Sequence, residues 1–236
     1  LFPNENIALL GKARHNVWGN WTTINIWMMK VLELFAGSRS VGKVAEEMGH
    51  EVFSVDVKDF DGIDLVKDIE FLKVEEIPFI PDFVWASPPC TTYSIAAISH
   101  HRDNGKPLTD FAAKSDRLVI NTLKLIKEYN CLYFIENPRG YLRKMSFMLG
   151  VPRTTVWYCK FGDKRAKPTD LWSNNLYNIF NPKGFISKTC FNNNKKCHHE
   201  SAPRGSKTGT QGLKNNYERS KIPPQLIKEI LLSIWT

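Results

Sequence analysis

A strand, a glycine-bearing turn, a short helix and a second strand follow one another from residue 31 onward. This is the feature that most restricts the fold of this 236-residue chain. The apolar run 31–35 predicts the first strand, residues 41–48 before Gly49 predict the helix, and residues 51–55 predict the second strand. Strands joined through a helix lie parallel in one sheet, and such sheets bind ligands at the carboxyl ends of their strands.

The alternation continues along the chain. Residues 82–86 and 132–135 predict further strands, apolar residues at helical spacing predict a helix over 110–129, and a final amphipathic helix is expected over 225–235. We therefore predict an α/β fold, a Rossmann-like sheet with helices on both faces and a core that ends near residue 160. A small, loop-rich basic region should follow the sheet.

Four parts are expected along the chain. Residues 1–28 show no clear periodicity and form an N-terminal extension of unknown role, with Met28 and Met29 marking a candidate native start. Residues 29–160 form the main domain, residues 161–218 the small basic region, and residues 219–236 the helix that returns to the main domain.

Charge is divided unevenly between the two halves. Residues 1–136 contain 14 Lys and Arg against 19 Asp and Glu, a net charge of −5; residues 137–236 contain 18 against 5, a net charge of +13. Only the second half should therefore face a polyanion, for which nucleic acid is the first candidate. Because the sequence has no signal peptide and no apolar run of about 18 residues, we expect a cytoplasmic protein without membrane contact. Its five cysteines should be reduced there.

Two features after the first strands are typical of a nucleoside-binding site. Gly37 lets the backbone approach a ligand, and Asp56, at the end of the second strand, can accept hydrogen bonds from both ribose hydroxyls. Asp68 could accept a hydrogen bond from an adenine amino group. No phosphate-binding GxGxxG or GKS/GKT sequence is present, which disfavours dinucleotides and nucleoside triphosphates.

The sharper signal is the loop Ser87-Pro-Pro-Cys-Thr-Thr-Tyr-Ser94, which directly follows a predicted strand. Its two prolines hold the loop extended and direct Cys90 away from the carboxyl edge of the sheet, where a nucleophile would stand. The neighbouring strand ends in Glu136-Asn-Pro138, so its carboxylate should reach the same edge and share a proton with a ring nitrogen.

These motifs together resemble the DNA (cytosine-5) methyltransferases, and in particular the compact, often phage-encoded branch of that family. Phe35-Ala-Gly37, Pro88-Pro-Cys90 with Ser94, Glu136-Asn-Pro138 and Ile222-Pro-Pro224 stand in the family's order and near its spacing, so the likeness spans residues 31–234. The family usually has Phe-Xaa-Gly-Xaa-Gly-Gly in the first motif, where this chain has Ser38-Arg39-Ser40 after Gly37, and Gln after the catalytic cysteine, where it has Thr91.

The resemblance implies the cofactor S-adenosylmethionine, double-stranded DNA as substrate, and a covalent mechanism on a cytosine flipped out of the duplex. Cys90 would be the nucleophile and Glu136 the acid, while Arg153 or Arg165 would replace the family's Gln-Xaa-Arg-Xaa-Arg motif, which is not clearly present. The cofactor would contact Phe35, Ala36, Gly37, Ser38, Asp56, Val57, Asp68, Ile69 and Pro88. Residues 29–160 would then be the catalytic, cofactor-binding domain of a monomer, with a cognate restriction enzyme left unknown.

The basic region is the expected target-recognition region, centred on 192–211. The residues expected to contact DNA are Ser94, Lys195, Lys196, Arg204 and Lys207. Cys190, Cys197 and His198, beside His199, are weak candidates for a zinc site. Their spacing differs from the usual Cys-x2-4-Cys and adjacent histidines do not easily bind one ion, which favours a polar loop with solvated histidines and no metal.

Three alternatives stay open on the sequence. Methyltransferases of exocyclic amines carry Pro-Pro-Tyr where this chain has Pro-Pro-Cys90, and they need no nucleophilic cysteine. An RNA cytosine-5 methyltransferase would use the same catalytic set. An inactive nucleic-acid-binding homologue would fit the replaced glycines of the first motif.

Overall fold

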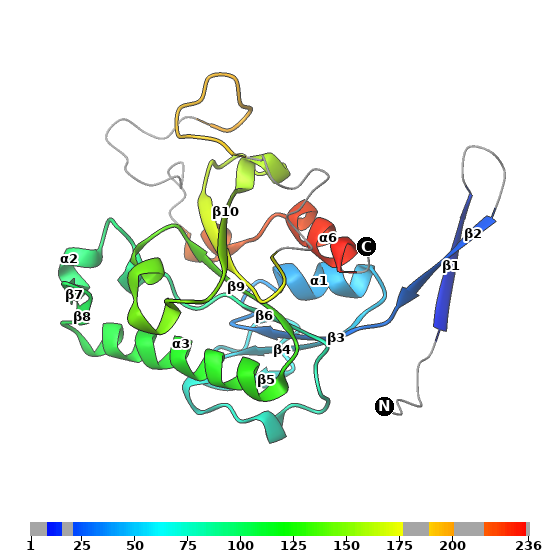
Figure 1. The fold of residues 1–236 in the computed structure, drawn as a ribbon, viewed down its shortest axis with the longest axis horizontal. Coiled ribbons are helices and arrows are strands. Elements are labelled where there is room, and N and C mark those ends of the chain that lie inside the picture. The colour runs from blue at the N-terminus through cyan, green and yellow to red at the C-terminus, as the bar shows by residue number, and fades with distance from the viewer. Residues whose placement is uncertain (1–8, 16–20, 177–188, 201–214, 235–236) are drawn as a thin grey trace.

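The computed structural model describes residues 9–15, 21–176, 189–200 and 215–234. Its centre is a seven-stranded sheet in the order β10-β11-β9-β6-β3-β4-β5 (Figure 1). The strands of this sheet are β3 (Lys30–Leu34), β4 (Glu51–Asp56), β5 (Leu65–Val66), β6 (Phe83–Ala86), β9 (Leu132–Pro138), β10 (Arg153–Trp157) and β11 (Pro168–Trp172). Neighbours from β5 to β9 are parallel, whereas β11 is antiparallel to both β9 and β10.

Helices cover both faces of the sheet, as the sequence predicts. The described helices are α1 (Ser40–Glu47), α2 (Ile98–His101), α3 (Asp110–Tyr129), α5 (Asn216–Ser220) and α6 (Pro224–Ser233). Figure 1 shows α1 and α6 together on one side of the sheet and α3 on the other. The mixed α/β class and the predicted positions of β3, β4, β6, β9, α1, α3 and α6 are therefore confirmed, with ends shifted by at most three residues.

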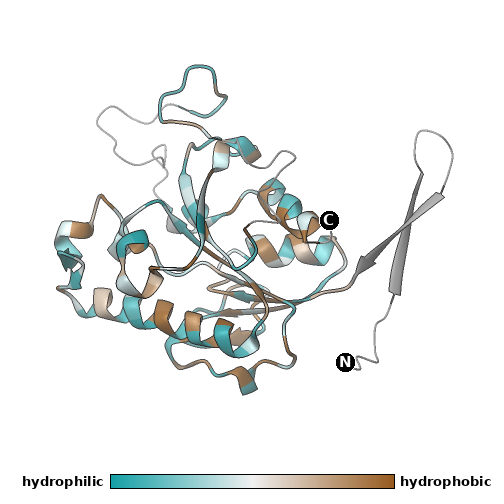
Figure 2. Cartoon of the chain, viewed as in Figure 1, coloured by the Kyte–Doolittle hydropathy of each residue, from teal (hydrophilic) through white to brown (hydrophobic). Residues whose placement is uncertain are grey.

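Two apolar cores fill the space between these layers. Along β3, Val31 faces the core with α1 and α6, while Leu32 and Leu34 face the core with α3. Because both faces are buried, the strand reads as an almost continuous apolar run. Figure 2 shows apolar and polar residues alternating along α3, the pattern of a helix with one buried face.

Local sequence sets the ends of the main helices. Thr109 caps α3 by accepting a hydrogen bond from the Ala112 amide at 3.2 Å. Asn130 ends the helix with a left-handed φ of 50°, a conformation that asparagine tolerates well. Pro224 begins α6, where its missing amide hydrogen costs nothing.

The sheet extends further along the chain than the sequence indicates. We expected its core to end near residue 160, but β11 (168–172) lies inside the sheet, between β9 and β10. The prediction was wrong because β11 begins with Pro168 and contains a buried Asp170, so it lacks the apolar signature of a central strand. Part of the region assigned to target recognition therefore belongs to the sheet, although the division into four parts remains a prediction.

Smaller elements complete the described chain. The N-terminal extension forms an antiparallel hairpin of β1 (Leu9–His15) and β2 (Trp21–Trp27), which Figure 1 shows to one side of the sheet. A second hairpin consists of β7 (Arg102–Asp103) and β8 (Lys106–Pro107). Among the described residues, no helix is both long enough and apolar enough to span a bilayer.

Candidate active site

The predicted site residues gather at the carboxyl edge of the parallel strands. At this edge the Ala36 amide donates to the Val55 carbonyl at 3.1 Å, and the Ser87 amide donates to the Leu34 carbonyl at 3.3 Å. Since β3 is the neighbour of both β4 and β6, these bonds hold the loops that follow three strands side by side. This is the edge at which a parallel α/β sheet binds its ligands.

The turn after β3 is shaped around the carboxylate of Asp56. Phe35 and Gly37 have left-handed φ angles of 58° and 45°, and the Gly37 amide donates to Asp56 Oδ2 at 3.0 Å. The Lys58 amide donates to Asp56 Oδ1 at 2.9 Å. A carboxylate has about four lone-pair sites, so two further hydrogen bonds are possible. Val57 beside it is 56% exposed, which leaves an apolar surface free next to the acceptor.

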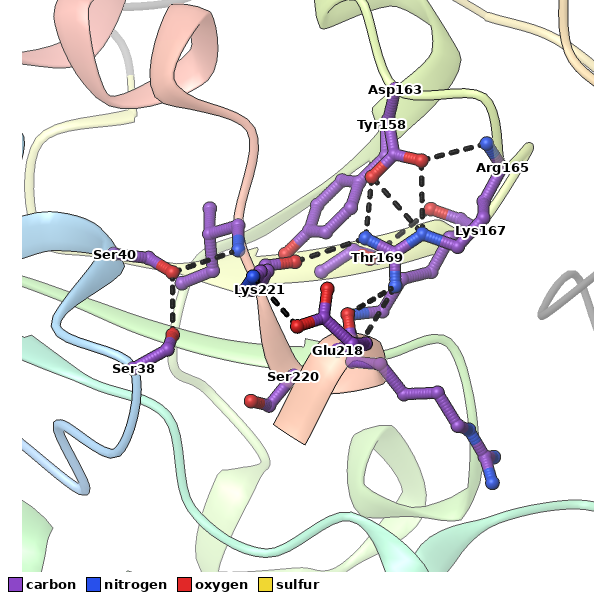
Figure 3. Close-up of polar contacts among 12 residues, drawn as sticks. Ser38, Ser40, Tyr158, Asp163, Arg165, Lys167, Thr169, Glu218, Ser220 and Lys221 are labelled. Carbon is purple, nitrogen blue, oxygen red and sulfur yellow. Dashed lines mark hydrogen bonds and ion pairs between the residues drawn. The ribbon is translucent and has the colours of Figure 1, made fainter. Parts of the chain in front are cut away.

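The three residues that follow Gly37, which are Ser38, Arg39 and Ser40, have partners of their own. Arg39 has a left-handed φ of 52°, as a glycine could, and its side chain bonds Ser54 at 3.0 Å and Glu46 at 2.5 Å. The hydroxyls of Ser38 and Ser40 lie 2.8 Å apart, and Ser40 accepts a hydrogen bond from the Ile222 amide at 3.2 Å (Figure 3). The altered turn is therefore fastened to the C-terminal Pro-Pro segment.

Glu33 is a site-forming residue that the sequence analysis missed. It lies buried within β3, and its carboxylate accepts the Val41 and Gly42 amides at 3.0 and 2.9 Å, at the N-terminus of α1. Burial raises the pKa of Glu33 to about 7, although these amide bonds and Arg39 act in the opposite direction. The sequence does contain a signal for Glu33, namely an acidic residue inside an apolar strand. Such a group needs buried hydrogen-bond partners.

Asp68 and Ile69 lie at the start of the short helix η1 (Ile69–Phe71), beyond β5. Asp68 caps this helix by accepting the Glu70 amide at 3.0 Å, and its other oxygen pairs with Lys114 at 2.6 Å. Ile69 is buried in the α3-side core. Both residues have structural partners here, and their contact with an adenine remains a prediction.

Cys90 is partly exposed in the loop after β6, immediately before the short helix η3 (Thr91–Tyr93). Burial raises the pKa of its thiol; the positive charges of Lys167 and Arg219 oppose this effect, and the negative charge of Glu136 adds to it. The resting group is therefore a thiol, whose conversion to the nucleophilic thiolate the nearby cations favour.

The loop of Cys90 and the end of β9 are joined directly. The Asn137 side-chain amide donates to the carbonyl of the buried Pro88 at 2.8 Å. Gly140 approaches the Tyr93 backbone so closely that an added Cβ would lie 2.5 Å from the Tyr93 carbonyl oxygen. These contacts fix the position of Cys90 relative to the strand that contains Glu136.

A buried arginine holds the segment that follows Cys90. Arg102 is 4% exposed and donates to the Thr92 carbonyl at 3.0 Å, to the Gly105 carbonyl at 3.2 Å and to both oxygens of Asp116. The hydroxyl of Tyr93 donates to the same Asp116 carboxylate at 2.7 Å. The sequence analysis did not identify this network, because its residues are separated by up to 23 positions.

Glu136 is buried and receives a hydrogen bond that the sequence did not predict. Tyr158, fully buried in the short helix η6 (Tyr158–Phe161), donates its hydroxyl to Glu136 Oε1 at 2.7 Å. Burial and the Glu136 charge raise the pKa of Tyr158, so it remains a donor. The bond orients the carboxylate without using Oε2.

Lys167 is a further residue of this site that the sequence analysis missed. It is 7% exposed, its ammonium lies 4.5 Å from the centre of the Tyr158 ring, and it donates to the Arg219 carbonyl at 3.1 Å. Its charge acts on both Glu136 and Cys90. Nothing in the sequence around Lys167 distinguishes it from the surface lysines of the basic half.

The two predicted arginines have different surroundings. Arg165, 6% exposed, pairs with Asp163 at 2.5 Å and donates to the carbonyls of Glu218, Arg219 and Lys221, so it joins the sheet to the C-terminal segment (Figure 3). Arg153, at the start of β10, pairs with the buried Asp170 at 3.2 Å. The charges of Arg165 and Glu136 act on each other.

The predicted DNA contacts are only partly within the described chain. Lys195 and Lys196 are exposed on the segment 189–200, and Ser94 is half-buried after η3. Arg204 and Lys207 lie outside the described residues. Of the two adjacent histidines, His198 is exposed but His199 is buried, so the expectation that both are solvated was wrong for His199.

Comparison with known proteins gives one match along almost the whole of a curated relative. The chain is 29% identical over 223 residues, 86% of its length and 99% of the relative's, to the "Probable DNA (cytosine-5)-methyltransferase" of Frog virus 3 (isolate Goorha). No protein-family model matches. The expected phage origin and restriction partner find no support in this match.

Comparison with solved structures gives partial matches to methyltransferases. The structure of Entamoeba histolytica methyltransferase EhMeth matches with a TM-score of 0.49 and 16% identity, over 66% of this chain and 55% of that one. A DNMT2 mutant of Spodoptera frugiperda matches with a TM-score of 0.44 and 18% identity, over 63% and 51%. This chain therefore spans about half the length of those proteins.

Proposed function

We propose that the chain is a DNA (cytosine-5) methyltransferase, which transfers a methyl group from S-adenosylmethionine to carbon 5 of cytosine in double-stranded DNA. Its 29% identity to the viral relative over 86% of the chain supports this proposal. One observation supports the assignment of roles. Cys90 follows β6, Glu136 lies in the neighbouring parallel strand β9, and the charge of the buried Lys167 acts on both. A methyltransferase of exocyclic amines has no use for a cysteine held beside a carboxylate in this way.

The proposed chemistry begins with the electron-poor ring of cytosine. The Cys90 thiolate adds to carbon 6 and forms a carbon–sulfur bond, while the electron pair of the 5,6 double bond moves toward carbon 5. Glu136 protonates or hydrogen-bonds ring nitrogen 3 and so disperses the charge of the adduct. Tyr158 holds the Glu136 carboxylate in place for this contact.

The second half of the reaction regenerates both groups. Once carbon 5 carries the methyl group, its proton leaves to a base and the electron pair of that carbon–hydrogen bond reforms the double bond. As the double bond reforms, the carbon–sulfur bond breaks and its electron pair leaves with Cys90 as the thiolate. Lys167 and Arg219, whose charges favour the thiolate over the thiol, assist this departure as well as the first attack.

The turn after β3 fits S-adenosylmethionine, which supplies an electrophilic methyl group when bound. Phe35, Ala36 and Gly37 would lie against the cofactor, and Asp56 retains lone pairs for ribose hydroxyls beside the exposed Val57. Four further residues are assigned to the same cofactor: Ser38, Asp68, Ile69 and Pro88. Because Arg39 has the left-handed φ of a glycine, the altered motif keeps a turn of this shape.

The basic half would bind the DNA around the flipped cytosine. Unpairing and unstacking a base costs a few kcal/mol, which phosphate contacts can offset. Lys195 and Lys196 are exposed for such contacts. DNA binding should therefore weaken steeply with added salt, measured by fluorescence anisotropy; an affinity that is independent of salt would contradict this assignment.

The experiment that tests the function is nucleoside mass spectrometry of DNA, and separately of RNA, incubated with the protein and S-adenosylmethionine. We expect 5-methylcytosine in DNA, none with Cys90→Ser, and an unchanged yield with the matched control Cys131→Ser. Methylation of an exocyclic nitrogen, of RNA alone, or of neither nucleic acid would refute the proposal.

A further inference from the structure

Four side chains with metal-binding atoms converge at a place that the proposed reaction does not use. Cys159 comes from η6, and Cys190, Cys197 and His199 come from the segment 189–200. Their sulfur and ring-nitrogen atoms all lie within 4.8 Å of one another, and all three cysteines are free thiols. The segment therefore folds back so that both of its cysteines and one of its two histidines meet Cys159.

We propose that Cys159, Cys190, Cys197 and His199 bind one Zn²⁺ in a tetrahedral site that fastens segment 189–200 to the sheet domain. In tetrahedral zinc sites, adjacent sulfur and nitrogen ligands lie roughly 3.6 Å apart, given the usual zinc–ligand bond lengths. Cys190 Sγ and His199 Nδ1 are 3.7 Å apart. Three cysteines and one histidine are also an established ligand set of structural zinc sites.

Charge and hydrogen bonding around the sulfurs agree with a bound cation. On binding, the three thiols release their protons to solvent, and three thiolates with Zn²⁺ and a neutral histidine leave a net charge of −1. The Asn194 side-chain amide already points at Cys190 Sγ from 3.5 Å, where it would donate to a metal-bound thiolate. Thiolates select zinc over the hard cations calcium and magnesium.

The structure assigns the nitrogen ligand to His199 and not to His198. His199 is 6% exposed with Nδ1 facing the sulfurs, and its Nε2 has no hydrogen-bond partner in the described part of the chain. His198 instead lies against the Asp163 carbonyl through Nε2, at 3.1 Å. Only one of the adjacent histidines therefore points into the cluster, which removes the geometric objection to a site containing both.

In the described part of the chain, the packing of this segment on the sheet domain centres on the same cluster. Its large apolar residue, Phe191, is 62% exposed, whereas Cys190 and Cys197 pack against Trp157, Cys159 and Ala166. It is linked to the sheet domain by the Glu200 amide, which donates to the Lys164 carbonyl at 2.8 Å, and by the contact of His198 with Asp163. A metal bound to Cys159 and to the segment would anchor the segment, which contains Lys195 and Lys196, to the sheet domain.

Metal analysis of the full chain tests this proposal without reference to activity. Protein purified without added metal or chelator and passed through gel filtration should contain about one zinc per chain by inductively coupled plasma mass spectrometry. Exchange with Co²⁺ should give the intense visible bands of a tetrahedral thiolate site. A zinc content far below one per chain, together with an octahedral cobalt spectrum, would overturn the proposal.

Matched variants locate the site. Cys197→Ser and His199→Ala should lose the bound zinc or release it to a chelator at least tenfold faster, whereas Cys131→Ser and His198→Ala should retain it. If a ligand variant does not fold, the cobalt spectrum of the unaltered protein still shows whether the metal site is tetrahedral with thiolate ligands or octahedral. A disulfide between two of the cluster cysteines in the native protein, with no zinc uptake after reduction, would refute the zinc site and would indicate a redox-active cysteine pair.

Discussion

The parallel and antiparallel sides of the sheet build the candidate site in different ways. On the parallel side, β3, β4 and β6 each end in a loop whose backbone and short side chains form the site, as Gly37, Asp56 and Cys90 do. On the antiparallel side, the segment that connects β10 to β11 contributes long buried side chains, chiefly Tyr158, Arg165 and Lys167. The parallel side of the site is encoded by short sequence motifs, whereas the antiparallel side depends on contacts between segments that are distant in the sequence.

This difference has an energetic consequence. Buried charged groups need partners at every polar atom, and Arg165 and Lys167 find theirs among the backbone carbonyls of residues 218–221. The C-terminal segment is thereby part of the site, although it lies more than 50 positions away in sequence. Changes on the antiparallel side should therefore affect stability and catalysis together.

The largest effect is expected for Arg165→Met. Removal of the guanidinium leaves Asp163 without its ion-pair partner and removes the Arg165 donor from the carbonyls of Glu218 and Lys221, while the Arg219 carbonyl keeps Lys167. The free energy of unfolding should fall by about 3–5 kcal/mol. The control is Arg153→Met, whose arginine is partly exposed and should cost much less. Urea denaturation measures both; equal losses would show that the C-terminal segment does not depend on Arg165.

On the parallel side, Glu33 should make stability depend on pH. Its pKa is about 7 in the folded chain against 4.5 unfolded, so between these values only the folded state holds the proton. The Glu33 contribution to the free energy of unfolding should therefore fall by about 3 kcal/mol as pH rises through this window. Glu33→Gln should abolish that slope relative to wild type, and the exposed control Glu128→Gln should keep it; identical slopes in all three proteins would contradict the buried acid.

A smaller effect is expected for Tyr158→Phe, which removes the hydroxyl that orients Glu136 and little else. A hydrogen bond to a charged group contributes about 1.5–3 kcal/mol, so kcat should fall by roughly 10- to 100-fold. KM for DNA should change little, and the pH profile of kcat should shift, because the carboxylate loses a donor. A variant with unaltered kcat and pH profile would show that Tyr158 is only a packing residue.

The smallest effect concerns the reactivity of Cys90. Its raised pKa means that alkylation by iodoacetamide should accelerate as pH rises above the usual range of a thiol. In Lys167→Met the midpoint should move to still higher pH, because a cation that lowers this pKa is gone, whereas the exposed control Lys164→Met should leave it unchanged. Alkylation of Cys90 is followed by peptide mass spectrometry. A midpoint unaffected by Lys167→Met would show that the charge of Lys167 does not act on the Cys90 thiol.

The sequence predicted the parallel side well because its signals are local. Apolar runs, Gly37 and the Pro-Pro-Cys90 loop lie within a few residues of one another, and β3, β4, β6 and β9 were located from them. It failed at β11, where a buried Asp170 is neutralised by Arg143 and Arg153 from other elements. Tyr158, Lys167 and the meeting of Cys159 with His199 were not predictable for the same reason, since each partner is supplied by a separate segment.

Covalent trapping tests the central claim most directly. Duplex DNA in which 5-fluorocytosine replaces the target base cannot lose a proton from carbon 5, so the adduct with Cys90 should persist when S-adenosylmethionine is present. We predict a denaturant-resistant protein–DNA complex with the wild-type chain and Cys131→Ser, and none with Cys90→Ala. No trapped complex with the wild type on DNA that it methylates, or an equal yield with Cys90→Ala, would contradict the assignment of Cys90 as the nucleophile.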